Sequence, residues 1–242
     1  CAGLVGFTAC DSFLDEDPKS SLTLDTYYKT SADIIGNVNY LYRDGAPDKM
    51  GNMTGAYRGS SLSVMNMVTG YFVNEYEGQE VDCSYARQLT RQNFTQSCCN
   101  YLTNDTWKSC YKSINVANAV IKYVDGVEMD NQAQYKAEAR FFRALNYFYL
   151  VKMFGDVPMV IEPTEDATLV EYPTRTAASE VFNTVIIPDL QFAVENLPNA
   201  TFAGNSHRVT KYAADMLLAD VYMRLGAVSY THLRAHETKA NL

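Results

Sequence analysis

Aromatic side chains alternate with amides and charged groups in the stretch from Tyr71 to Asn104. A sugar presents apolar C–H faces and hydroxyl groups, so its site needs aromatic surfaces beside hydrogen-bonding side chains. Long polar loops of this kind often carry function, although a packed surface loop is the alternative. We predict a site for a polyol ligand here. The predicted contacts are Tyr71, Tyr76, Asp82, Tyr85, Arg87, Asn93, Phe94 and Tyr101.

The same stretch contains several carboxylates that would be needed for a glycosidase pair, among them Glu75, Glu77, Glu80 and Asp82. Acidic loops are usually solvated, and no nucleophile elbow, zinc-protease motif or phosphate loop occurs in the sequence. We therefore expect no enzymatic activity, no catalytic residues, no cofactor and no metal site.

Four cysteines lie close together in the sequence: Cys83, Cys98, Cys99 and Cys110. Their spacing does not fit a zinc site. Disulfides would form among them in an oxidising compartment, but free or partly paired thiols are equally compatible with the spacing.

The N-terminus changes abruptly from small apolar residues to acidic ones at Cys10. Residues 1–9 are typical of the end of a secretory signal, and Thr8-Ala9-Cys10 resembles a bacterial lipoprotein box. We expect Cys10 to be lipidated, because acyl chains on such a cysteine anchor the protein in a membrane. The alternative is that Cys10 is an ordinary thiol.

The C-terminus departs from the pattern that precedes it. Residues 228–238 resemble the translation of a transposase-type sequencing adapter, and they follow an apolar helical segment without a turn signal. We therefore expect residues 228–242 to be non-native, so that His232 and His236 carry no information about a metal site. A genuine tail is the alternative.

Composition excludes several classes of partner. The formal net charge of −8 and the absence of Lys/Arg clusters argue against nucleic acid and against docking on anionic lipid through a basic patch. No apolar run reaches the length needed to cross a bilayer. The chain has 18 Tyr and 11 Phe but one Trp, which is compatible with sugar binding or with half-buried core edges.

Hydrophobic spacing predicts a mainly α-helical protein. After a short helix near Thr23, a helix capped by Thr30 or Ser31 reaches Tyr42. The later helices are predicted at Thr106–Val124 capped by Asp105, Gln132–Phe154 ended by Gly155, Ala177–Leu197 kinked at Pro188, and Val209–Leu225. Small residues on these helices favour tetratricopeptide-like hairpins stacked beside an irregular, loop-rich part.

The segment Glu138–Pro158, EARFFRALNYFYLVKMFGDVP, closely resembles the hallmark of the SusD/RagB family. Three further stretches resemble the family in the same order: Phe13–Pro18, Tyr111–Asn118 and Arg208–Tyr222. The hallmark is apolar on two adjacent stripes, so we interpret it as buried scaffold in which Arg140 and Arg143 pair with carboxylates or helix-end carbonyls. Trp107 is likewise expected in the core.

The resemblance implies a helical, lipid-anchored protein on the outside of the outer membrane. It implies that residues 10–227 are the incomplete N-terminal part of a nutrient-binding lipoprotein, which captures glycans for a SusC-like TonB-dependent transporter. The alternative from the residues themselves is a helical-repeat adaptor of the cell envelope that binds protein partners. The identity of the glycan is open, and peptides or other nutrients are alternatives.

Overall fold

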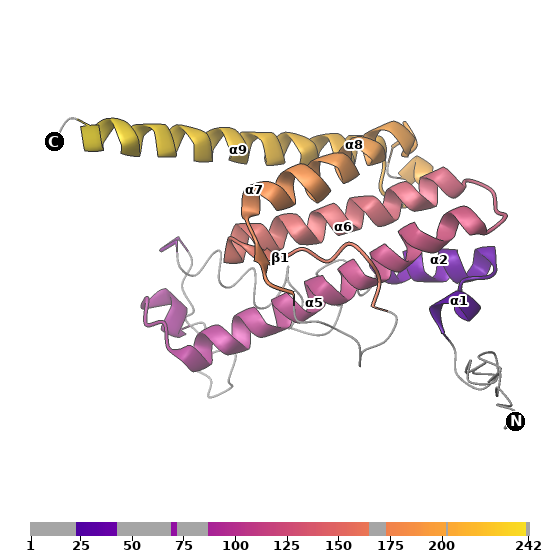
Figure 1. Ribbon diagram of the computed structural model, residues 1–242, viewed down its shortest axis with the longest axis horizontal. Helices are drawn as coiled ribbons and strands as arrows, with labels where there is room; N and C mark the ends of the chain where they lie inside the picture. Colours follow the sequence, from indigo (N-terminus) through magenta and orange to yellow (C-terminus); the bar gives the residue numbers. More distant parts are fainter. Residues whose placement is uncertain (1–22, 43–68, 72–86, 165–172, 202, 241–242) are drawn as a thin grey trace, which may run out of the picture.

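The computed structural model describes residues 23–42, 69–71, 87–164, 173–201 and 203–240, with the side chains of 97–105 and 227–240 outside that description. Its long helices lie side by side in a stack (Figure 1). Helix α5 (Gln96–Tyr123) forms an antiparallel hairpin with α6 (Gln132–Phe154), α8 (Ile187–Asn196) covers another side of α6, and α9 (Lys211–Ala240) packs on α8. The predicted mainly α architecture of packed helical hairpins is confirmed.

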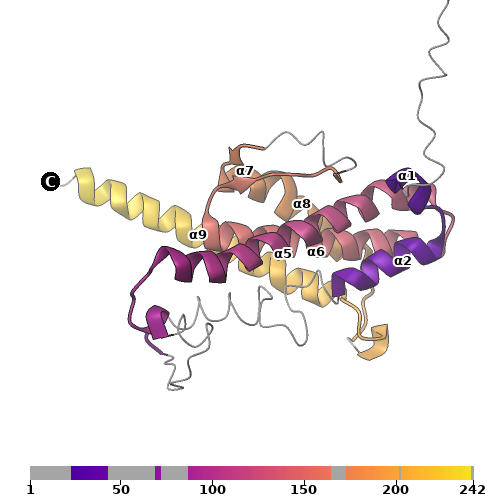
Figure 2. The same ribbon diagram turned by 90° about the horizontal axis from the view of Figure 1, so that it is seen from below.

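The N-terminal helices close one end of this stack. Helix α1 (Leu24–Tyr27) is followed by α2 (Ser31–Tyr40), which lies against α5 and α6 (Figure 2). Thr30 caps α2 as predicted: the Asp33 amide donates to its hydroxyl at 3.4 Å, and the Asp33 carboxylate accepts from the Thr30 amide at 2.8 Å.

Helix α6 lies at the centre because it is buried on nearly every side, as the two apolar stripes of the hallmark predict. Its bounds are the predicted ones, and it ends where Gly155 adopts a φ of 70° and donates its amide to the Val151 carbonyl. Its buried side chains are Ala137, Glu138, Ala139, Phe141, Phe142, Arg143, Ala144, Asn146, Tyr147, Phe148, Leu150 and Val151. The hallmark therefore forms the core of the stack.

Helix α5 is longer than predicted. It begins at Gln96 and not at Thr106, so Asp105 is inside the helix and the prediction that it caps the helix is wrong. Residues 96–105 contain neither Gly nor Pro, and extending an existing helix is easier than starting one. Trp107 is half-buried on α5 and contacts the rings of Tyr111 and Phe154, which confirms its predicted place in the core.

The predicted helix from Ala177 to Leu197 is interrupted before its proline. Helix α7 (Ala178–Val181) runs into a wide π-helical turn (Phe182–Ile186), and α8 follows with Pro188 in its first turn. Pro188 has no amide to donate, so the helix cannot continue regularly through it. The predicted kink thus takes the form of a π turn in which the Ile187 amide donates to the Phe182 carbonyl.

An extended strap, residues 157–164, lies along the α5–α6 hairpin. Its first two residues form strand β1 (Val157–Pro158), which pairs antiparallel with β2 (Arg175–Thr176). The Tyr111 hydroxyl donates to the Pro158 carbonyl at 2.7 Å, and the Tyr147 hydroxyl bonds both backbone groups of Val160. Side chains of the hairpin therefore replace the strand partners that this short segment lacks.

Helix α9 continues to Ala240 and so extends through the residues that we expect to be non-native. Among the described residues, no helix is long and apolar enough to cross a membrane.

Candidate functional site

The predicted ligand residues fall partly on described structure. Tyr71, Arg87, Asn93 and Phe94 belong to the described part, while Tyr76, Asp82 and Tyr85 lie outside it, as does the expected lipidation site Cys10. The backbone of Tyr101 is in α5 and not in a loop, which corrects its predicted setting; its side chain is outside the description. The structure thus describes one end of the predicted site, next to the start of α5 (Figure 1).

Phe94 stands on a closed turn just before α5. The turn is fixed because Gln92 adopts a φ of 53°, the Asn93 amide donates to the Gln88 carbonyl at 2.8 Å, and the Thr95 hydroxyl donates to the Gln88 side chain at 2.8 Å. Phe94 is 56% exposed. An ordered turn that presents a ring to solvent is what a stacking contact with a sugar requires, since little mobility is lost on binding.

Residues with hydrogen-bonding side chains precede and follow Phe94 in the sequence. Arg91, Gln92, Asn93 and Gln96 are all exposed, and together they offer amide and guanidinium groups beside the apolar ring. Tyr71 is 90% exposed after a turn in which Gly70 has a φ of 79°. Tyr71 and Phe94 are thus both accessible to solvent, and their role as ligand contacts stays a prediction.

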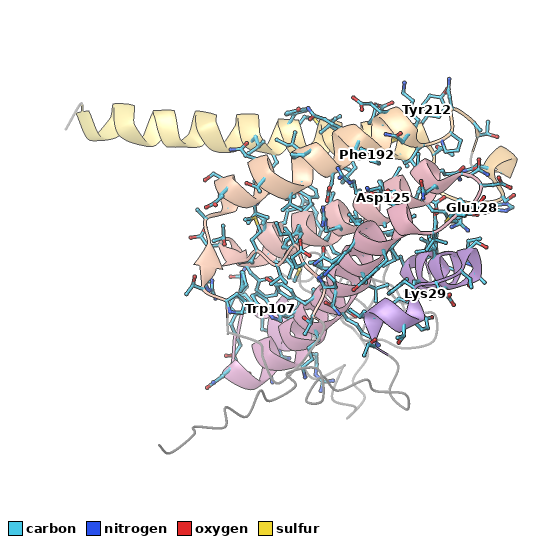
Figure 3. The ribbon with its side chains drawn as sticks, turned by 45° about the vertical axis from the view of Figure 1, so that its right-hand side comes forward. Lys29, Trp107, Asp125, Glu128, Phe192 and Tyr212 are labelled. Carbon is cyan, nitrogen blue, oxygen red and sulfur yellow. The ribbon has the colours of Figure 1, made fainter. Side chains whose placement is uncertain are left out.

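A hollow in the surface lies at the opposite end of α5. At about 1.5 Å per residue, the 28 residues of α5 separate the two ends by about 40 Å. Figure 3 shows Glu128 at this far end, while Trp107 marks the half of α5 that leads to Phe94. The hollow has a volume of about 640 Å³ and is lined by Ser31, Ile35, Glu128, Met129, Asp130, Asn131 and Tyr135.

This hollow suits a sugar less well than the Phe94 turn. Its one aromatic ring, Tyr135, is half-buried, and the Arg208 guanidinium lies 5.3 Å from the centre of that ring. Glu128 and Asp130 at its rim are exposed carboxylates, which are normally solvated. The sequence prediction placed no site here, and nothing in the geometry requires one.

Charged side chains inside the stack form ion pairs between helices, although the buried Nε of Arg140 has no hydrogen-bond partner among the described residues. Arg143 forms a bidentate pair with Asp189 of α8, with N···O distances of 2.6 and 2.9 Å, and also donates to Asn118 of α5 at 2.9 Å. Asn118 in turn donates to the carbonyls of Val160 and Glu162 in the strap. The prediction that Arg143 pairs with a carboxylate is confirmed. We call these contacts among Arg143, Asp189 and Asn118 the Arg143 clasp, and its role is structural.

In the Arg143 clasp, burial and nearby charge shift the pKa of the Asp189 carboxyl in opposite directions. Removal from water raises the pKa of the Asp189 carboxyl, while the hydrogen bonds and charge of Arg143 act in the opposite direction. Arg140 lies 3.8 Å from this carboxylate and stacks over the Phe192 ring. A carboxylate held this way by arginines is poorly placed for proton transfer to a ligand.

A second clasp joins α2, α6 and the segment before α9. Glu138 is completely buried, accepts two hydrogen bonds from Nε of Arg208 at 3.0 Å and one from its Nη2 at 2.6 Å, and accepts another from the Tyr42 hydroxyl at 2.9 Å. The Tyr42 hydroxyl accepts from the Val209 amide, and burial raises the pKa of Tyr42. The sequence analysis did not name Glu138 and Asp189 as the buried partners of arginines. For Glu138 a signal was available, because it is a charged residue on an otherwise apolar helix face.

The described residues contain no group of three or more His, Cys, Asp or Glu arranged to hold a metal ion. Cys110 is a free thiol buried in the core of the stack, and burial raises its pKa to about 12. Cys110 thus has no disulfide partner among the described residues, while Cys83, Cys98 and Cys99 lie where no side chain is described, so the predicted alternatives for these three stay open.

Residues 12–223 match the family model described as SusD-like, starch-binding and associating with the outer membrane. Among curated relatives, the SusD-like protein P2 of Formosa agariphila is 28% identical over 217 residues, which are 89% of this chain and 40% of the relative. The chain therefore spans about 40% of the length of the curated relatives that it matches first.

Solved structures resemble the stack as well. A laminarin-binding SusD-like protein superposes with a TM-score of 0.67 at 24% identity, over 83% of this chain and 41% of that protein, and shows the fold alone. A structure with a xylogluco-oligosaccharide superposes with a TM-score of 0.56 at 25% identity, over 78% of this chain and 34% of that protein.

Proposed function

Because this chain belongs to the SusD-like family, we propose that it is part of a cell-surface protein that binds glycans and delivers them to a TonB-dependent outer-membrane transporter. The family match over residues 12–223 is the observation that carries the proposal. The structure that holds a xylogluco-oligosaccharide supports an oligosaccharide as the class of ligand.

We propose the Phe94 turn as one contact of this chain with the glycan. Its exposed ring, hydrogen-bonded turn and flanking amides provide a stacking surface with hydrogen-bonding groups beside it. Tyr71 extends the proposed site, together with Arg87, Asn93 and the predicted residues Tyr76, Asp82, Tyr85 and Tyr101. Catalysis is not part of the proposal, since binding and release are all that delivery requires.

The first experiment compares two equally exposed aromatic residues at different places. Phe94 is 56% exposed at the proposed site, and Tyr212 is 55% exposed on α9. Binding of xyloglucan fragments, laminarin and starch fragments is measured by calorimetry for the unmodified chain, Phe94→Ala and Tyr212→Ala. We expect Phe94→Ala to weaken binding of the preferred glycan about tenfold, which corresponds to about 1.4 kcal/mol, and Tyr212→Ala to leave it unchanged.

Two results would contradict this assignment. Equal affinities of Phe94→Ala and the unmodified chain would remove the Phe94 turn from the site. Binding of no glycan, together with specific binding of an envelope protein, would favour the helical adaptor.

Anchoring at Cys10 and a transporter partner complete the proposal. We expect a Cys10→Ala variant, expressed with its complete signal in the source organism, to lose acyl labelling and to leave the membrane fraction. We expect the unmodified protein to co-purify with the transporter encoded beside it. A labelled Cys10→Ala variant would contradict the lipidation site.

A further inference from the structure

The turn that carries Phe94 is basic, although the chain as a whole is acidic. Residues 87–96 contain two arginines and four side-chain amides but no Asp or Glu, whereas the chain has a formal net charge of −8. The acidic residues of the wider stretch, from Glu75 to Asp82, lie outside the described structure. The charge carried by the Phe94 turn itself is therefore opposite in sign to that of the protein.

Arg91 is the charged group nearest to the exposed ring in the sequence. It lies three residues before Phe94, its side chain is exposed, and its amide donates to the Arg87 carbonyl at 3.1 Å. The arginines inside the helix stack pair with buried carboxylates, but Arg91 has no carboxylate partner among the described residues. Its guanidinium is thus held at the surface with its hydrogen-bonding groups available to a ligand.

The ring and the guanidinium are close enough to contact the same oligosaccharide. Three residues span at most about 11 Å of chain, and both side chains belong to one hydrogen-bonded turn. A guanidinium presents a planar pair of N–H donors that fits the two oxygens of a carboxylate or of a sulfate group. A neutral sugar would use the amides of the turn but would give Arg91 no anionic partner.

The charge of the turn refines the proposed function and rests on it. We infer that the glycan bound at the Phe94 turn is anionic: one of its sugars stacks on Phe94, and a carboxylate or sulfate group pairs with Arg91. The overall negative charge of the protein repels such a ligand elsewhere on its surface, so the basic turn also determines where the ligand binds.

The test removes the charge once from the ligand and once from the protein. An array of neutral, uronate-containing and sulfated glycans identifies the best ligand of the unmodified chain. Reduction of its carboxyl groups to alcohols, or desulfation, then gives a neutral form with the same backbone. Calorimetry measures the affinity of both forms for the unmodified chain, Arg91→Gln and Arg224→Gln.

Arg224→Gln is the matched control because it causes the same change in net charge at a different place. Arg224 is exposed on α9, which is separated from α5 in the stack by α6 and α8 (Figure 1). Both substitutions are at exposed positions, so both variants should fold.

We expect the best ligand to be anionic and its neutral form to bind about tenfold more weakly. Arg91→Gln should weaken binding of the anionic form about tenfold and that of the neutral form less than about twofold, while Arg224→Gln should change neither. The step that removes the affinity, carboxyl reduction or desulfation, identifies the group that Arg91 binds.

Three results would overturn this inference and leave the proposed function in place. They are a neutral best ligand, an equal loss for both forms of the ligand in Arg91→Gln, and equal losses in Arg91→Gln and Arg224→Gln. Binding of no glycan on the array would overturn this inference together with the proposed function.

Discussion

Two buried carboxylates hold this stack of helices together, each through an arginine from another element. Glu138 is surrounded by Arg208, Tyr42 and Gln134, and Asp189 is clasped by Arg143. A buried pair contributes little beyond a well-packed apolar pair, but removing one partner leaves a charge without compensation. We interpret these pairs as specifying which helices meet, since the two partners of each pair come from different elements.

Neutralising Glu138 should destabilise the fold far more than neutralising one partner of an exposed ion pair. We expect Glu138→Gln to lower the free energy of unfolding by about 3–5 kcal/mol, because the guanidinium of Arg208 stays partly buried without its anion. Asp125→Asn removes the exposed pair with Lys136 and should cost less than about 1 kcal/mol. Urea denaturation of both variants measures the difference, and similar losses would contradict a structural role for Glu138.

At the scale of elements, the hairpin of α5 and α6 carries the strap on side-chain hydrogen bonds. Tyr111, Asn118 and Tyr147 reach from the two helices to the backbone of residues 158–162. The strap itself has only the two-residue pairing of β1 with β2. Its order is therefore imposed by the helices and does not arise from its own sequence.

Removing one hydroxyl should loosen the strap without unfolding the stack. Tyr147→Phe leaves the Val160 amide without its partner, while the Val160 carbonyl keeps its hydrogen bond from Asn118, so we expect faster hydrogen exchange at Val160 and a stability loss of about 1–3 kcal/mol. Tyr212→Phe, at an exposed position of α9, is the matched control and should change neither. Unchanged exchange at Val160 in Tyr147→Phe would show that the Tyr147 hydroxyl is not what orders this part of the strap.

At the scale of the whole molecule, several ionisable groups are buried in their neutral forms. Burial raises the pKa of Cys110 and of Tyr147 to about 12 in each case, and it raises the pKa values of Tyr42 and Tyr111 as well. The folded state thus keeps protons that the unfolded chain releases near the ordinary values of 9.0 for the thiol and 10.0 for tyrosine. The free energy of unfolding therefore depends on pH in the alkaline range.

The stabilising effect of these neutral groups is complete below about pH 9 and declines as pH rises toward 12, since the unfolded state binds fewer protons there. Each such group changes the unfolding free energy by about 1.4 kcal/mol per pH unit inside its own window. We expect Tm to fall steadily from pH 9 upward when followed by circular dichroism. A constant Tm between pH 8 and pH 11 would contradict the burial of these groups.

The sequence by itself determined the helical class, the bounds of α6, the cap of α2 and the burial of the hallmark, because hydrophobic period and capping chemistry are local. It also predicted Phe94 and Tyr71 as ligand contacts; the structure shows both side chains exposed, and their role in binding stays a prediction. Only the tertiary structure decided the partners of Glu138 and Arg143, which lie 70 and 46 residues away in the chain. The π form of the turn before Pro188 and the early start of α5 were also found only in the structure, because a proline predicts a disturbance but not its form, and no Gly or Pro in residues 96–105 fixes where α5 begins.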